Sequence, residues 1–177
     1  MYEYAPVTPG IRQAVYDELK YLEGIRPAPA ALEKQLERTK LPQDEAQLHS
    51  LLMTEGDLEA GELEVPVEWL ASLAAQGRAL YIEPGLWIAA EQEEDYERAF
   101  SMDGTEEAAA IVRRLLRYRG GHTPGQIGER YFLPGERVGA ILDVLCSRSE
   151  IVEADGIFYH KKLYDRARQS TLKNLRH

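Results

Sequence analysis

A pattern of apolar residues and glycine occurs twice in this chain of 177 residues, at a constant separation of 71 positions. Sliding the sequence over itself by that distance, without gaps, places Gly85 on Gly156, and an apolar run follows each glycine. The pairs that coincide are Val67 with Val138, Leu70 with Ile141, Ala74 with Leu145, Leu80 with Ile151, Gly85 with Gly156, Leu86 with Ile157, Trp87 with Phe158 and Ile88 with Tyr159. A unit that recurs at a fixed period indicates a repeated fold, so we expect two similar units in tandem.

Apolar periodicity and helix-ending residues predict helices and one hairpin in the first hundred residues. The first helix follows Pro9-Gly10, has Ile11, Val15, Leu19 and Leu22 at helical spacing, and ends at Gly24. The later helices are expected at about 29–38 with Leu32 and Leu36 buried, 43–53, 66–77 with Val67, Leu70 and Ala74 on one face, and 91–100, which is strongly acidic. Between the last two helices, residues 78–82 and 86–89 suit strands around a Glu83-Pro84-Gly85 turn.

The second part of the chain repeats this plan more clearly. Helices are expected from Thr105 to about 119, from 124 to 131, and from about 134 to 146, the last with Val138, Ile141, Leu142 and Leu145 inward. Strands at 150–153 and 157–160 flank Asp155-Gly156, a strong hairpin signal, and a final helix runs from Lys161 to about Leu175. Three helices followed by a hairpin form the winged-helix plan. We therefore expect an α+β, mostly α, fold of two tandem winged-helix units, residues 1–100 and 104–177.

Several classes of protein are excluded by the composition. The longest apolar runs have four or five residues, and the N-terminus lacks a basic stretch followed by an apolar one, so neither a membrane span nor a signal peptide is expected. The lone Cys146, expected to be a small core residue, fits a reducing cytoplasm. The four histidines lack metal-ligand spacing, and no phosphate-binding glycine loop or catalytic triad motif occurs. We expect a cytoplasmic chain with no cofactor, metal or catalytic site of its own.

Charge is distributed unevenly along the chain. The net charge is -9, but residues 1–100 contain 8 Lys/Arg and 20 Asp/Glu, whereas residues 101–177 contain 13 and 10. From Ile157 to His177 there are six basic residues and one acidic residue, Asp165. Such asymmetry indicates a nucleic-acid or other interaction surface, or simply charges that solvate helix faces.

The third helix of a winged helix usually enters the major groove. Its outward positions here, Glu136, Arg137, Gly139, Ala140, Asp143, Ser147 and then Arg148, include only two basic residues. Base readout requires more Arg, Asn or Gln, so this helix is predicted to read sequence poorly, or only to pack.

The last helix is the better candidate for a contact surface. Its basic and polar residues are spaced by 4, 3, 4 and 3 positions, which places them on one face. The residues that lie mostly on the other, apolar side are Leu163, Tyr164, Ala167, Thr171 and Leu175. The basic face suits phosphate contacts, which set affinity rather than sequence preference. The alternatives are pairing with the acidic helix of the first unit, or solvation alone. The predicted nucleic-acid-binding residues are Arg137, Arg148, His160, Lys161, Lys162, Arg166, Gln169, Lys173 and Arg176.

Several segments resemble one family of helicases. The large helicase-related (Lhr) proteins have a "WLxxLxxxxRA" helix that leads to a strand ending in "WIAxE". This chain is similar to the first motif at Trp69-Leu70, Leu73 and Arg78-Ala79, and to the second at Trp87-Ile88-Ala89 and Glu91. Two further segments resemble the same family. One is the upstream run from Leu41-Pro42-Gln43-Asp44 to Leu52, followed by Gly56-Asp57-Leu58; the other is the closing Thr171-Leu172 with Leu175-Arg176. The resemblance extends from about Leu41 to the C-terminus.

The resemblance implies a winged-helix segment from beyond the motor core of a superfamily 2 ATP-dependent helicase, a hydrolase whose ATP and Mg belong to motor domains absent from this chain. The long C-terminal region of that family resembles the tandem winged-helix modules of a family of helix-turn-helix DNA glycosylases, but the paired Gln/Asp catalytic motif of these glycosylases is not found in this chain. We expect a non-catalytic accessory module that binds DNA or RNA weakly and without sequence specificity, and that contacts the rest of the helicase polypeptide. The alternative is a protein-interaction or oligomerisation module, which would include a homo-oligomer; no membrane partner is expected.

Overall fold

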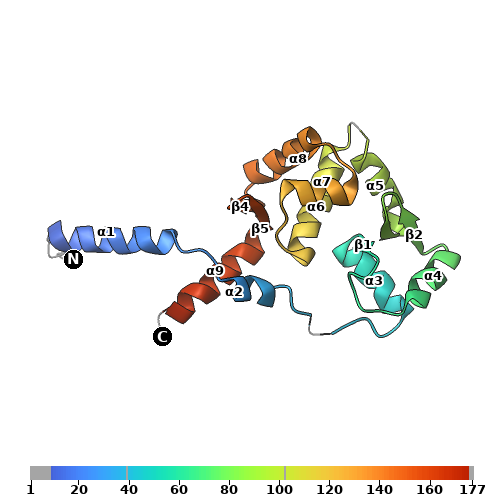
Figure 1. Ribbon diagram of the computed structural model, residues 1–177, viewed down its shortest axis with the longest axis horizontal. Coiled ribbons are helices and arrows are strands. Elements are labelled where there is room, and N and C mark those ends of the chain that lie inside the picture. The colour runs from blue at the N-terminus through green and yellow to red at the C-terminus, as the bar shows by residue number, and fades with distance from the viewer. Residues whose placement is uncertain (1–8, 39, 102, 176–177) are drawn as a thin grey trace, which may run out of the picture.

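The computed structural model describes residues 9–38, 40–101 and 103–175, and within them the protein is α+β and mostly helical (Figure 1). The first part of the chain contains α1 (Pro9–Glu23), α2 (Pro29–Lys34), α3 (Glu45–Glu55), β1 (Leu58–Glu59), α4 (Val67–Ala75), β2 (Ala79–Ile82), β3 (Leu86–Ala89), the short 3-10 helix η1 (Ala90–Gln92) and α5 (Glu93–Ala99). The second contains α6 (Thr105–Arg119), α7 (Pro124–Tyr131), α8 (Gly135–Ser147), β4 (Ile151–Ala154), β5 (Ile157–His160) and α9 (Lys161–Leu175). The predicted helices and both hairpins are confirmed, whereas β1 was not expected.

Two small antiparallel sheets accompany the helices. In the first sheet the strand order is β1-β3-β2, with Leu58 opposite Trp87. The second sheet is the β4–β5 hairpin, and an isolated bridge joins His122 to Phe158 beside it. In both parts, therefore, a short extended segment between helices pairs with the second strand of the hairpin.

The two hairpins show that the repeat has two registers. Ala89 and His160, which are 71 positions apart, are equivalent residues of β3 and β5. Ala89 pairs with Ala79, and His160 pairs with Ile151. The equivalent residues before the turn, Ala79 and Ile151, are therefore 72 positions apart, not 71. The two strands have the same alternation of burial when aligned in this way. The turn of the first hairpin has three residues and that of the second has two, so the separation returns to 71 in β3 and β5.

This register corrects the ungapped alignment of α4 with α8. The N–H of Arg78 donates to the carbonyl of Leu73, and the N–H of Glu150 donates to that of Leu145, again 72 positions apart. Leu73 and Leu145 are both fully buried, whereas Val67, expected on the inner face, is 76% exposed. The prediction for Val67 was wrong because the buried face of α4 passes through Leu70 and Leu73, which leaves Val67, in the first turn, on the solvent side.

The predicted units share their hydrophobic interior. One buried cluster combines Leu86, Ile88, Tyr96 and Ala99 from β3 and α5 with apolar residues of α6, α7, α8 and β4. A second, smaller cluster lies among α3, α4 and the β1–β3 sheet, with Trp69 and Trp87 packed against it. The chain is also tightly packed where α5 joins α6, since a Cβ on Gly104 would lie 1.5 Å from the carbonyl oxygen of Arg98. The two parts therefore stabilise each other.

The segment after α1 lies along the last helix. α2 packs on α9, the Ala28 N–H donates to the Thr171 hydroxyl at 2.9 Å, and Arg168 donates to the backbone carbonyls of Leu22 and Ile25. Figure 1 shows α1 extending away from this contact and from the body of the molecule. Residues near the two ends of the described chain thus meet, which the sequence pattern did not predict.

Three burial predictions need correction. Leu32 and Leu36 are only half-buried, because α2 lies on the surface of α9 rather than inside a core. Leu36 instead packs against Gly120, since a Cβ on Gly120 would lie 2.7 Å from Cδ1 of Leu36. Cys146, expected in the core, is exposed because the buried face of α8 passes through Leu142 and Leu145.

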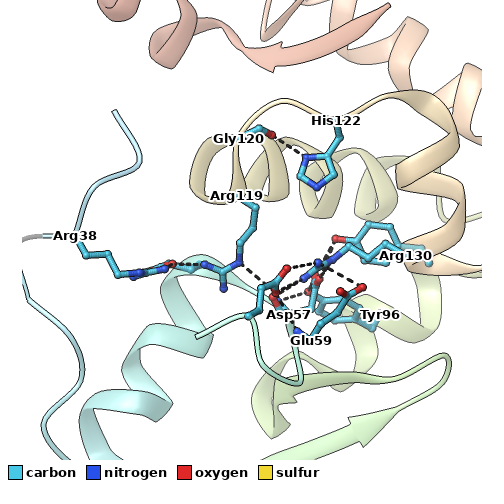
Figure 2. A network of polar contacts seen from close by, with 11 residues as sticks. Arg38, Asp57, Glu59, Tyr96, Arg119, Gly120, His122 and Arg130 are labelled. Carbon is cyan, nitrogen blue, oxygen red and sulfur yellow. Dashed lines mark hydrogen bonds and ion pairs between the residues drawn. The ribbon is translucent and has the colours of Figure 1, made fainter. Parts of the chain in front are cut away.

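A buried polar network joins the first part of the chain to the second (Figure 2). Asp57, 4% exposed, accepts hydrogen bonds from Arg130 Nε at 2.7 Å and from the Tyr131 hydroxyl at 3.0 Å. The Tyr96 hydroxyl also donates to this carboxylate, and Arg130 donates to Glu62 at 2.7 Å. Burial raises the pKa of both tyrosines above the usual range, so the hydroxyls remain donors. Because both carboxylate oxygens already accept bonds from this chain, the network holds the structure together rather than a ligand.

Candidate nucleic-acid interface

The predicted row on α9 faces solvent. Lys162, Arg166, Gln169 and Lys173 are exposed. On the opposite side Leu163 and Ala167 are buried and Tyr164 and Thr171 are half-buried, whereas Leu175, at the end of the helix, is 59% exposed. The predicted division of this helix into a polar and an apolar face is therefore confirmed up to Thr171 and was wrong for Leu175. We call the exposed side chains of Lys162, Arg166, Gln169 and Lys173 the α9 row. Arg176, predicted to continue it, lies outside the described residues.

The cations of the α9 row are available for a partner. Across residues 9–38, 40–101 and 103–175, no ion pair joins Lys162, Arg166 or Lys173 to an acidic side chain. The predicted alternative was that the row pairs with the acidic helix of the first part. α9 packs instead on α2, β4 and β5, and Figure 1 shows α5 on the other side of α6. The structure thus does not pair these two helices.

Other predicted residues already have intramolecular partners. Arg137 on α8 is half-buried and donates to the Thr105 hydroxyl at 3.1 Å and to the carbonyl of Ser101 at 3.0 Å. Arg148, at the end of α8, forms an ion pair with Glu106. Both arginines fasten α8 to the residues that begin α6, so they are set apart from the α9 row.

His160 and Lys161 connect the hairpin to α9. Lys161 forms an ion pair with Asp165 at 3.0 Å, one helical turn along. His160 is half-buried at the end of β5, and its Nδ1 accepts the backbone N–H of Lys162 at 3.2 Å. In the neutral ring the proton is therefore on Nε2. Burial lowers the pKa of His160 below its usual 6.5, and the positive charges of Arg117, Arg113 and Lys162 lower it further.

Sequence reasoning missed the contribution of α6. Arg113 lines a hollow together with His160, Lys161 and Lys162, which come from the hairpin and α9. The signal was present in the sequence, since Arg113 and Arg117 are spaced by four residues and lie on the same face of one helix. The periodicity of its apolar residues identifies the buried side of α6, but not the elements that its basic side approaches.

The described residues contain no group of three His, Cys, Asp or Glu side chains placed to hold a metal ion. Within the same residues, no helix combines the length and apolar character needed to cross a bilayer.

Comparison of the chain with protein-family models, with curated proteins and with solved structures finds no match.

Proposed function

We propose that this chain is an accessory nucleic-acid-binding module of an Lhr-type ATP-dependent helicase, non-catalytic by itself. The observation that carries the proposal is the α9 row, whose three cations face solvent from one side of a helix and lack acidic partners among the described residues. A helix of this kind contacts backbone phosphates, which confer affinity without base specificity. The motif resemblance to the helicase family supports the context.

We also propose that the two parts of the chain are winged-helix units. In support, α6, the His122 bridge, α7, α8 and the β4–β5 hairpin follow in the winged-helix order. The first part has α3, β1, α4 and a hairpin in the same order, but residues 60–66 form turns and bends where the second part has α7. The first unit would therefore be an abbreviated one.

Base reading by α8 is not part of this proposal. The outward residues of α8 include Glu136 and Asp143, and Arg137 is engaged with the backbone beside α6. Binding is instead expected to be weak, because the net charge of -9 repels nucleic acid from the rest of the surface. The row and the hairpin beside it would supply most of the contacts.

The test measures binding of short fluorescent single-stranded and duplex DNA by anisotropy over a range of salt concentrations. Two to four phosphate contacts predict a slope of roughly -2 to -4 in log affinity against log salt for duplex DNA. The combined change Lys162→Ala, Arg166→Ala and Lys173→Ala should flatten this slope.

A matched control removes three exposed cations elsewhere, by Arg12→Ala, Lys20→Ala and Lys40→Ala. It changes the net charge equally, so any difference between the two triple variants reports the location of the contact. Equal loss in both variants, or no binding by the parent protein at low salt, would overturn the proposal.

A second candidate function, protein interaction or oligomerisation, is favoured by α1. This helix projects from the body (Figure 1) and leaves Val15 51% and Leu19 54% exposed. An isolated helix of 15 residues is only marginally stable in water, so a partner would stabilise it. Light scattering after size exclusion tests self-association: a dimer that Val15→Glu with Leu19→Glu converts to a monomer would support it, whereas a monomeric parent would contradict self-association.

A further inference from the structure

A hollow of about 520 Å³ lies where α6, the end of the β4–β5 hairpin and the first turn of α9 meet. Arg113 enters from α6, His160 from the end of β5, and Lys161 and Lys162 from the start of α9. Basic side chains from three separate elements thus converge on one concave site. The hollow is large enough to hold a phosphate group.

Positive charge exceeds negative charge in and around this hollow. Glu150 and Asp165 also line it and are already paired, with Arg113 at 3.0 Å and with Lys161 at 3.0 Å respectively. Lys162 forms no ion pair within the described residues. Arg117 of α6 lies close enough to lower the pKa of His160. Two carboxylates and three permanent cations therefore line the hollow, so one positive charge remains in excess for an anion.

His160 adds a donor that does not depend on protonation. Its Nδ1 accepts the Lys162 N–H, so the neutral ring carries its hydrogen on Nε2. The charged groups that act on the ring are Arg113 and Arg117 of α6, Lys162 of α9, and Glu150 before β4, of which only Glu150 favours the protonated form. An anion in the hollow would neutralise the cations and make protonation of His160 easier.

We propose that this hollow holds a phosphate oxyanion of the nucleic-acid backbone, with Arg113, Lys162 and the His160 ring as donors. The proposal rests on the proposed function, because it extends the backbone bound by the α9 row into the hollow through Lys162, which belongs to both. It adds α6 to the contact surface and fixes the position of one phosphate relative to the hairpin.

The first test uses the full chain and the same fluorescent DNA. Arg113→Gln should reduce the magnitude of the salt slope by about one unit, as expected for one lost phosphate contact. Glu150→Gln should have the opposite effect on affinity, because it removes a carboxylate from the hollow and frees Arg113. The exposed residues Arg12 and Glu136 supply matched controls, Arg12→Gln and Glu136→Gln, with the same changes of charge outside the hollow.

These variants should fold normally. The side chains of Arg113 and Glu150 are 44% and 28% exposed, so their ion pair is partly open to solvent, and such pairs contribute little to stability. If the parent binds DNA but Arg113→Gln and Glu150→Gln behave like their controls, the hollow is not a phosphate site and the inference is overturned. The α9 row would still explain binding in that case.

The second test does not use nucleic acid. The pKa of His160 is measured by NMR of its ring signals in inorganic phosphate and in chloride at matched ionic strength. Phosphate should raise the pKa of His160 in the parent and not in Arg113→Gln. A raised pKa together with no DNA binding would overturn both the proposed function and the backbone as the source of the phosphate, leaving a site for a free phosphate compound. No effect of phosphate in the parent would contradict the inference directly.

Discussion

Replacing Asp57 by asparagine removes one negative charge from the buried network while keeping the size of the side chain. The carboxylate accepts from Arg130 at 2.7 Å, from Tyr131 at 3.0 Å and from Tyr96, so all of its partners are donors. An amide presents only one oxygen and turns an NH2 group toward these donors. Asp57→Asn therefore leaves the guanidinium of Arg130, whose side chain is 5% exposed, with less negative charge beside it.

The expected loss follows from these contacts. Removing one partner of a buried ion pair costs about 3–5 kcal/mol of unfolding free energy. Glu62 continues to accept from Arg130 at 2.7 Å, so we expect a loss near the lower end, about 3 kcal/mol. For a chain of this size that corresponds to a fall in melting temperature of roughly 6–12 °C.

Urea and thermal denaturation followed by circular dichroism measure this loss. Asp143→Asn on α8 is the control, since Asp143 is exposed, and it should change the unfolding free energy by less than about 0.5 kcal/mol. Because the hydrophobic cluster is shared by both parts of the chain, the parent should unfold in one transition. A loss no larger than that of the control would refute the reasoning, because it would mean that the network is not buried in solution.

Four further predictions concern the rest of the fold. Burial alone would raise the pKa of Glu62, but its bonds from Arg130 and neighbouring groups outweigh this and lower the pKa below 4.5. The stability it contributes is therefore present above about pH 4.5 and lost as the pH falls through the lowered value, so Glu62→Gln should flatten the acid side of a melting-temperature curve against pH. Leu145→Ala should cost about 2–5 kcal/mol, and an unchanged urea midpoint would show that the phase assigned to α8 is wrong. Gly139→Ala, in open space on a helix, should stabilise by up to about 1 kcal/mol. By contrast, Gly121→Ala should destabilise by about 1–3 kcal/mol, because its Cβ would lie 2.4 Å from a tyrosine ring of β5, and equal midpoints for the two glycine variants would contradict both.

Local patterns were sufficient to predict the helices and hairpins, because each is specified by neighbouring residues. The spacing of Val138, Ile141, Leu142 and Leu145 matches the buried face of α8 in the structure. The ungapped repeat failed in α4 for an equally local reason, a hairpin turn longer by one residue. A one-residue gap placed at the turn would have assigned Leu73, rather than Ala74, to the inner face.

Contacts between distant segments could not be read from these patterns. Asp57 and Arg130 are 73 positions apart, and neither lies in a motif that indicates the other. The packing of α2 on α9 and the approach of Arg113 to His160 likewise depend on how complete elements are arranged in space. Periodicity identifies which face of a helix is buried, but not which element covers it, so the α9 row was found from sequence and the hollow beside it was not.

The most direct test of the account is a titration of the isotope-labelled full chain with short DNA at low salt, observed by NMR of backbone and side-chain signals. The account predicts that the largest shifts occur along α9 from Lys162 to Lys173, at His160 and at Arg113, while the acidic helix α5 remains unchanged. Shifts concentrated on the outward face of α8 or on α1, with none along α9, would contradict it.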